Sequence, residues 1–174
     1  MISIKAGEFA IKNKGKTVLV IASVERQAYL LFEKILSYLL SKYKNEIKKG
    51  KDRPTKSKLK LRNGSIIYCL PTGLSGYGIR GYTIDLLIAD EAAFIPEEVW
   101  TAVTPMLAAT GGDIILLSTP HGKGGYYYQC FSDDSFTSFH VSSEECLRIP
   151  KEWLEKEKQW KTKVEYAQEY LGGS

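Results

Sequence analysis

The sequence predicts an α/β fold with three layers, in which a mostly parallel sheet is flanked by helices. Short aliphatic runs, typical of strands buried on both faces, alternate along the chain with segments of helical period. One run, Leu86–Ala89, stops at Asp90 and Glu91, at the strand end where open α/β sheets bind ligands. The length of 174 residues, with 44% hydrophobic and 25% charged residues, fits one soluble domain over residues 1–174.

The first predicted elements are a helix, a strand and a second helix. Ile2–Ile11 is typical of the last turns of a helix, which closes at Asn13–Gly15. Thr17–Ala22 is an almost unbroken apolar run and predicts a buried strand. Ser23–Lys49 carries apolar residues at helical spacing and predicts one long helix.

A hairpin and a second buried strand are expected next. Leu59–Leu61 and Ile66–Leu70 flank Asn63-Gly64, a strong turn signal between two antiparallel strands. Asp85–Ala89 then predicts a strand of the parallel sheet.

The remaining segments continue the alternation. Pro96–Leu107 predicts a helix, and Asp113–Leu117 predicts another apolar strand. Phe136–Val141 predicts a further strand, and Pro150–Leu171 predicts one amphipathic helix. The apolar face of that helix would carry Trp153, Trp160, Val164, Ala167 and Leu171.

The composition excludes two classes of protein and indicates a compartment. No apolar stretch reaches the length of a membrane span, and Met1 is not followed by the apolar core of a signal peptide. The three cysteines, Cys69, Cys130 and Cys146, are far apart and lack metal-ligand spacing. This usage is typical of reduced thiols in a cytoplasmic chain.

The net charge of +4 hides a basic segment. Between Lys42 and Arg62 there are ten Lys or Arg against Glu46 and Asp52, so the rest of the chain carries −4. Such a segment either contacts nucleic-acid phosphates or is the solvated end of a helix followed by a loop, and the sequence leaves both open. The candidate DNA-binding residues are Lys48, Lys49, Lys51, Arg53, Lys56 and Lys58.

The candidate catalytic residues surround the two buried strands. Asp90 can hold Mg²⁺ and Glu91 can orient or deprotonate an attacking water; the alternative is a polar turn after a strand. Ser118 and Thr119, at the end of the next strand, can sense a γ-phosphate or form an ordinary Ser-Thr-Pro turn. Arg80 lies in a glycine-rich segment and can act as an arginine finger or be a surface residue.

No phosphate-binding loop can be identified. Gly15-Lys16-Thr17 resembles the end of such a loop, but Ala10 stands where its first glycine is needed. A helix is expected before this segment and a strand after it, which is the reverse of the required order.

The order and spacing of these segments resemble the ATPase domain of phage terminase large subunits, the motors that package viral DNA. The resemblance rests on Thr17–Ala28, Ile79–Gly81, Asp85–Phe94, Ser118–Gly122 and Glu169–Leu171. It implies a P-loop NTPase-like fold, with Asp90 as the Walker B aspartate that holds Mg²⁺ and Glu91 as the catalytic glutamate. It further implies a coupling motif at Ser118 and Thr119, an arginine finger at Arg80, and a nucleotide-adjacent Gln27.

The resemblance also predicts what this chain lacks. In the family the phosphate loop and its strand precede the helix that here begins at Met1, and a nuclease domain follows about Leu171. We therefore expect no ATPase activity from the chain alone. The missing strand would lie beside the Asp113–Leu117 strand, where its absence would leave strand edges unpaired. Three alternatives would fill its place: the protein starts before Met1, a separate chain completes the sheet, or the Phe136–Val141 strand closes the gap.

Three functions remain open at this stage. The first is a motor that uses ATP and Mg²⁺ to translocate double-stranded DNA; the second is a non-hydrolysing DNA-binding or assembly module; the third is a helicase-like core. For a motor, the resemblance implies a terminase small subunit and a portal protein as partners, a ring homo-oligomer, and a location in the host cytoplasm at the procapsid, with no membrane.

Overall fold

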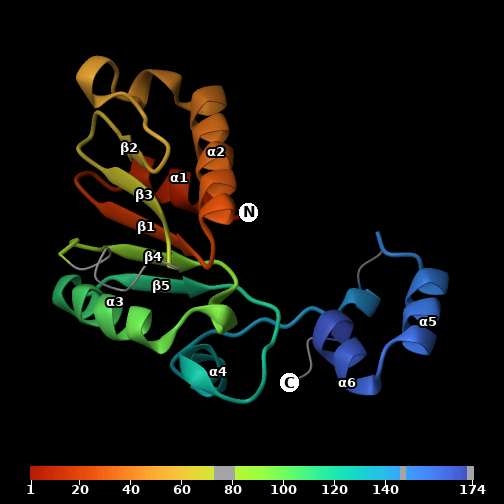
Figure 1. Cartoon of the computed structure of the whole chain (residues 1–174). Helices are drawn as coiled ribbons and strands as arrows, with labels where there is room; N and C mark the ends of the chain where they lie inside the picture. The colour runs from red at the N-terminus through yellow and green to blue at the C-terminus, as the bar shows by residue number, and fades with distance from the viewer. Residues whose placement is uncertain (73–80, 146–147, 172–174) are drawn as a thin grey trace. The chain divides into compact units, whose positions relative to one another are not determined.

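A computed structural model describes residues 1–72, 81–145 and 148–171, and Figure 1 shows its helices and strands. The chain divides into two compact units, Met1–Leu117 and Ser118–Ser174. The larger unit contains the sheet. Among the described residues, no helix combines the length and apolar character needed to cross a membrane.

The larger unit is built on a five-stranded sheet of order β2-β3-β1-β4-β5. The strands are β1 (Thr17–Ala22), β2 (Lys58–Lys60), β3 (Ile66–Pro71), β4 (Leu86–Ala89) and β5 (Asp113–Leu116). β1 pairs in parallel with both β3 and β4, and β4 pairs in parallel with β5. Only β2 is antiparallel, and it forms the predicted hairpin with β3. The mostly parallel sheet is therefore confirmed.

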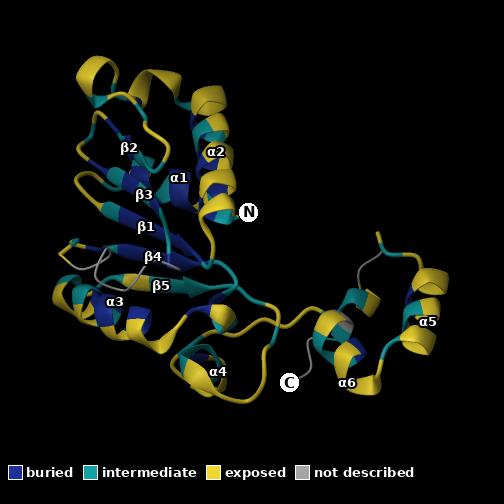
Figure 2. Ribbon diagram, viewed as in Figure 1, coloured by how far each residue is buried: buried dark blue, intermediate teal, exposed yellow. Residues whose placement is uncertain are grey.

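Two helices cover one face of this sheet and a third covers the other. α1 (Ile2–Lys12) and α2 (Glu25–Lys42) share a buried cluster with Val18 and Val20 of β1. α3 (Glu97–Thr110) follows β4 and leads to β5, on the side of β1 away from β3. Because parallel crossovers are right-handed, connections that run in opposite directions place their helices on opposite faces. Figure 2 shows the buried strands between helices whose outer sides are exposed.

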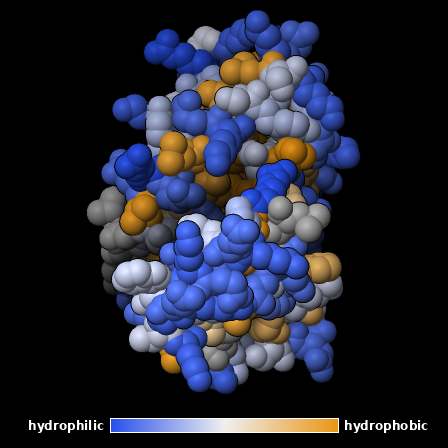
Figure 3. Space-filling view, turned by 90° about the vertical axis from the view of Figure 1, so that its right-hand side faces the viewer, coloured by the Kyte–Doolittle hydropathy of each residue, from blue (hydrophilic) through white to orange (hydrophobic). Residues whose placement is uncertain are grey.

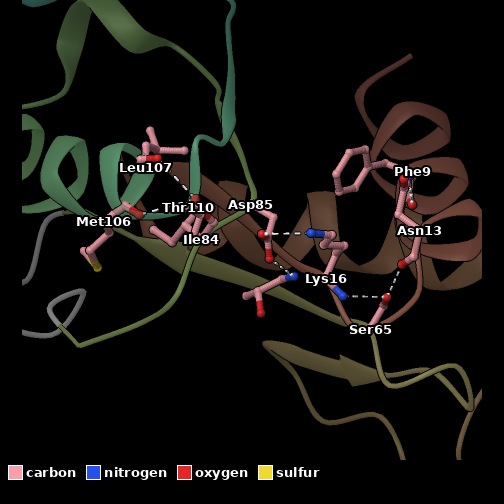
Figure 4. A network of polar contacts seen from close by, with 10 residues as sticks. Phe9, Asn13, Lys16, Ser65, Ile84, Asp85, Met106, Leu107 and Thr110 are labelled. Atoms are coloured by element: carbon pink, nitrogen blue, oxygen red, sulfur yellow. Dashed lines mark hydrogen bonds and ion pairs between the residues drawn. The ribbon is translucent and has the colours of Figure 1, made fainter.

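The amino ends of the parallel strands are tied together by polar contacts (Figure 4). Asp85, just before β4, accepts a hydrogen bond from the Thr17 N–H at 2.9 Å and pairs with Lys16 at 3.7 Å. The Lys16 N–H donates to Ser65 Oγ at 3.1 Å. These contacts satisfy backbone groups at the edge of the sheet opposite to Asp90.

α2 is shorter than the predicted Ser23–Lys49 helix. It ends at Lys42, and two short 3₁₀ turns follow, η1 (Lys44–Glu46) and η2 (Gly50–Asp52). Ile47 pairs with Leu61 across an antiparallel bridge and is 3% exposed. Burying Ile47 beside the hairpin removes more apolar surface from water than another exposed helical turn would, so the helix stops.

The predicted strand at Phe136–Val141 is wrong. These residues form neither strand nor helix, and Phe139 and Val141 are 85% and 76% exposed. The apolar residues 136, 139 and 141 do not keep the period of two that places side chains on one face of a strand. The outer edge of β5 consequently has no strand paired with it among the described residues.

The predicted helix at Pro150–Leu171 is broken into three parts. They are α5 (Lys151–Trp160), α6 (Lys163–Tyr166) and the π-helical segment η6 (Ala167–Leu171). Thr162 starts α6 as an N-cap and forms a reciprocal capping box with Glu165. Trp160 is 86% exposed and Val164 is 66% exposed, so the predicted continuous apolar face does not exist. An additional helix, α4 (Gly125–Ser132), begins at the end of the glycine-rich stretch, where the sequence pattern predicts none.

Candidate nucleotide site

Asp90 and Glu91 lie at the carboxyl end of the buried strand β4. Leu86, Leu87, Ile88 and Ala89 are at most 2% exposed, whereas Asp90 and Glu91 are partly exposed. The Asp90 N–H donates to the Ile21 carbonyl at 3.0 Å, and the Ala92 N–H donates to the Leu117 carbonyl at 2.9 Å. The backbone of the acidic pair is therefore held between the ends of the two neighbouring strands.

Asp90 also receives a side chain from α2. Gln27 Nε2 donates a hydrogen bond of 2.8 Å to Asp90 Oδ2. The chain turns at Ser23 and Val24 after β1, so the first turn of α2 lies over the strand end. The bond orients the carboxylate and leaves Oδ1 outside this interaction.

Glu91 has an unusual backbone conformation. Its φ of 50° and ψ of 46° lie in the left-handed region, and it is the single non-glycine residue with positive φ among the described residues. This conformation costs an L-amino acid roughly 1–2 kcal/mol. Such outliers concentrate at functional sites, and here the tight turn directs the chain from β4 into η4 (Ala92–Phe94).

The amino end of α1 lies at the same edge of the sheet. A connection of only a few residues, Asn13–Lys16, joins α1 to β1, so the two elements run in opposite directions. α1 therefore begins where β1 ends (Figure 1). The first N–H groups of a helix and its dipole attract anions, so this end of α1 adds positive potential near Asp90 and Glu91.

The acidic pair suits a hard cation held jointly with phosphates. The described residues contain no group of three or more His, Cys, Asp or Glu that would enclose a metal. Mg²⁺ is ordinarily bound through one or two carboxylates together with substrate phosphates and water, rather than by an all-protein cage. Asp90 supplies a carboxylate of that kind.

The other predicted catalytic residues are Ser118, Thr119 and Arg80. Ser118 and Thr119 follow directly after Leu117, whose N–H donates to the Ala89 carbonyl at 3.0 Å, and they begin the smaller unit. Arg80 lies outside the described residues. The structure therefore brings together Gln27, Asp90 and Glu91. The Gln27–Asp90 bond is the contact that sequence reasoning misses, although the family resemblance predicts a position beside the nucleotide for Gln27.

The basic segment forms an exposed surface at η1, η2 and β2. Lys49, Lys51, Arg53 and Lys56 are exposed, while Lys48 and Lys58 are partly buried. Lys58 Nζ lies 5.4 Å from the centre of the Tyr68 ring. Figure 3 shows mainly hydrophilic side chains at the upper end of the molecule, the end at which η1 and η2 lie in Figure 1. The positive charge of this segment is therefore available to solvent.

Comparison with known proteins connects this chain to a family. A family model described as terminase large subunit, T4likevirus-type, N-terminal, matches residues 2–174. The terminase large subunits of Thermus phage G20c and Thermus virus P23-45 are each 30% identical over 112 residues. That match covers 53% of this chain and 23% of each relative, so the chain spans about a quarter of their length.

Solved structures share the fold. The large terminase ATPase domain of Thermus phage P74-26 superposes with a TM-score of 0.83 at 23% identity, over 99% of this chain and 82% of that domain. The large terminase of another thermophilic bacteriophage, solved in complex with ADP, gives a TM-score of 0.70 at 13% identity, over 94% of this chain and 42% of that one. The chain belongs to the terminase large subunit family, and it corresponds to the N-terminal domain of that family.

Proposed function

We propose that this chain is the ATPase core of a DNA-packaging motor, which couples Mg²⁺-dependent ATP hydrolysis to translocation of double-stranded DNA. The observation that carries the proposal is the acidic pair at the end of β4, with Asp90 oriented by Gln27 at 2.8 Å. The family match supports the same interpretation.

The residues at the carboxyl end of β4 and around it have distinct roles in hydrolysis. Asp90 binds Mg²⁺, which when bound neutralises charge on the β- and γ-phosphates. Glu91 orients the attacking water and accepts its proton. The backbone turn at Glu91, with a φ of 50°, sets the direction in which the side chain leaves the backbone. Gln27 keeps Asp90 in one rotamer, and the amino end of α1 attracts the phosphates.

Three further roles rest on the family alone. Ser118 and Thr119 follow β5 directly and couple hydrolysis to movement of the segment after them. Arg80 supplies an arginine finger to a neighbouring subunit of a ring. The terminase small subunit and the portal protein are the expected protein partners. Large terminase structures of a thermophilic bacteriophage, solved with ADP and with ATP-gamma-S, support nucleotide binding by this fold.

The test is turnover by a Glu91→Ala variant of the terminase large subunit that carries this domain. ATP hydrolysis should fall to background, while the affinity for ATP changes little, because Glu91 acts on water rather than on the nucleotide. Glu98→Ala, at an exposed position in the first turn of α3, is the matched control and should retain activity. Substantial hydrolysis by Glu91→Ala would assign the catalytic role elsewhere.

A DNA-binding module without hydrolysis is the second candidate, and the exposed basic segment favours it. Phosphate contacts by lysines and arginines give affinity without any need for a nucleotide. DNA binding by a protein that shows no Mg²⁺-ATP turnover would decide for this second function.

A further inference from the structure

The smaller unit, Ser118–Ser174, contains a cavity of about 240 Å³, and all of its lining residues belong to that unit. Aromatic side chains form part of its walls, namely those of Tyr127, Tyr128, Phe131, Phe139 and His140. The stretch from Ser118 to Gly122 forms another part. Pockets that hold a whole drug-sized ligand typically measure about 300–1,000 Å³, so this one suits a single planar ring system.

The apolar residues around the cavity are more exposed than core packing alone would leave them. Phe139 is 85% exposed, Phe131 is 45% exposed and Val141 is 76% exposed. The buried hydrophobic residues of the unit, by contrast, are Cys130, Leu154 and Tyr166 among those described, and none of them lines the cavity. A cluster of exposed apolar side chains around a hollow indicates a binding surface rather than a core.

Polar groups at the cavity are suited to the edge of a nucleobase. Gln168 contributes an amide with both a donor and an acceptor, and His140 contributes an imidazole. Glu169 also lines the cavity, and its carboxylate pairs with Lys161 at 2.7 Å. Flat aromatic faces with a few donors and acceptors at the rim are the combination that holds a base by stacking and edge hydrogen bonds.

We propose that this cavity binds a purine base. Phe139 stacks on the face of the base, and the Gln168 amide bonds its edge. The proposal goes beyond the ATPase function proposed above, because it rests on the aromatic side chains of this cavity and uses neither Asp90 nor Glu91. Ser118 and Thr119 also line the cavity, so the base would lie beside the two residues to which the proposed function gives the coupling role. The base belongs either to a free nucleotide or to a nucleotide of DNA, since both present the same ring and the same edge.

The experiment measures the affinity of the 174-residue chain for adenosine, which carries the base without any phosphate, by ligand-detected NMR. Phe139→Ala should weaken adenosine binding by about tenfold, because one stacking face is lost. Phe139→Tyr keeps an aromatic face and should restore the affinity. Trp160→Ala removes an aromatic residue that is 86% exposed in the same unit and does not line the cavity, so it is the matched control.

The two sources of the base are separated by two further probes, AMP and a short single-stranded oligodeoxyadenylate. If Phe139→Ala lowers the affinity for AMP more than the affinity for the oligonucleotide, the base belongs to a free nucleotide. If it lowers the affinity for the oligonucleotide more, the base belongs to DNA. Adenosine that does not bind the unmodified chain, or that binds Phe139→Ala equally well, would refute the base site. Neither result bears on the proposed ATPase function, which is tested separately by the turnover of Glu91→Ala.

Discussion

Gln27 Nε2 donates to Asp90 Oδ2 at 2.8 Å, joining the first turn of α2 to the end of β4. The two residues are 63 positions apart in the sequence. Gln27 belongs to α2, whereas Asp90 follows directly after β4. The bond makes the orientation of the carboxylate depend on the placement of α2. Asp90 is thus positioned by the fold before any ligand arrives.

Gln27→Leu should therefore lower the apparent affinity for Mg²⁺ without unfolding the domain. Hydrogen bonds to charged groups contribute about 1.5–3 kcal/mol, so the Mg²⁺ concentration for half-maximal ATP turnover should rise about tenfold or more. Lys34→Ala, at an exposed position of the same helix, is the control. The measurement is a Mg²⁺ titration of turnover at saturating ATP in the large subunit, and an unchanged midpoint would remove Gln27 from the site.

Glu91→Gly should give a more stable chain than Glu91→Ala. Glycine adopts positive φ at little cost, so the glycine variant of the 174-residue chain should be about 1 kcal/mol more stable than Glu91→Ala in urea unfolding. At Glu98, in the first turn of α3, the order should reverse, because glycine is the poorer helix former. Equal stability of the two Glu91 variants would show that the turn does not need the left-handed conformation.

The sheet can be predicted from the sequence because its strands are recognised locally. β1 and β4 are short apolar runs, and burial on both faces leaves no other arrangement for them in a domain of this size. The placement of Asp90 and Glu91 follows from the rule that ligands bind at the carboxyl ends of parallel strands. Both inferences need only residues adjacent in the chain.

Features that depend on distant or competing contacts cannot be predicted in this way. The Gln27–Asp90 bond requires the position of α2 over the sheet, which no local pattern specifies. The sequence predicts that the helix after Lys151 continues, because its apolar period persists beyond Trp160. Thr162 instead caps a new helix with Glu165, and this local hydrogen bonding prevails over the weak apolar period.

The carboxylate of Glu8 should make stability sensitive to acid. It accepts hydrogen bonds from Tyr38, from Tyr43 at 2.9 Å and from Lys42 at 2.9 Å, which join α1 to the end of α2. The Tyr38 hydroxyl first, and then Lys42 and Tyr43, lower the pKa of Glu8 from 4.5 to about 2. A lowered pKa in the folded state means that the stabilisation is present above pH 4.5 and is lost as the pH falls towards 2.

Glu8→Gln should consequently lower the urea midpoint of the chain at pH 7, and the deficit should shrink between about pH 5 and pH 2. Glu46→Gln, at an exposed position of η1, serves as the control and should follow the unmodified chain throughout. A deficit that stays constant over this range would mean that Glu8 stabilises the helices through packing rather than through its charge.

The basic segment should determine how DNA binding responds to salt. Each lysine or arginine that contacts a phosphate contributes about 0.9 to the slope of log affinity against log salt concentration. Replacing the four exposed cations of the segment with glutamine should therefore flatten the slope by up to about 3–4. They are Lys49, Lys51, Arg53 and Lys56.

The control removes the same charge from exposed positions of the smaller unit, namely Lys123, Lys151, Lys156 and Lys163. Fluorescence anisotropy with a short DNA duplex at several salt concentrations gives both slopes. Equal slopes in the two quadruple variants would show that net charge alone, and not the segment at η1, η2 and β2, attracts the duplex.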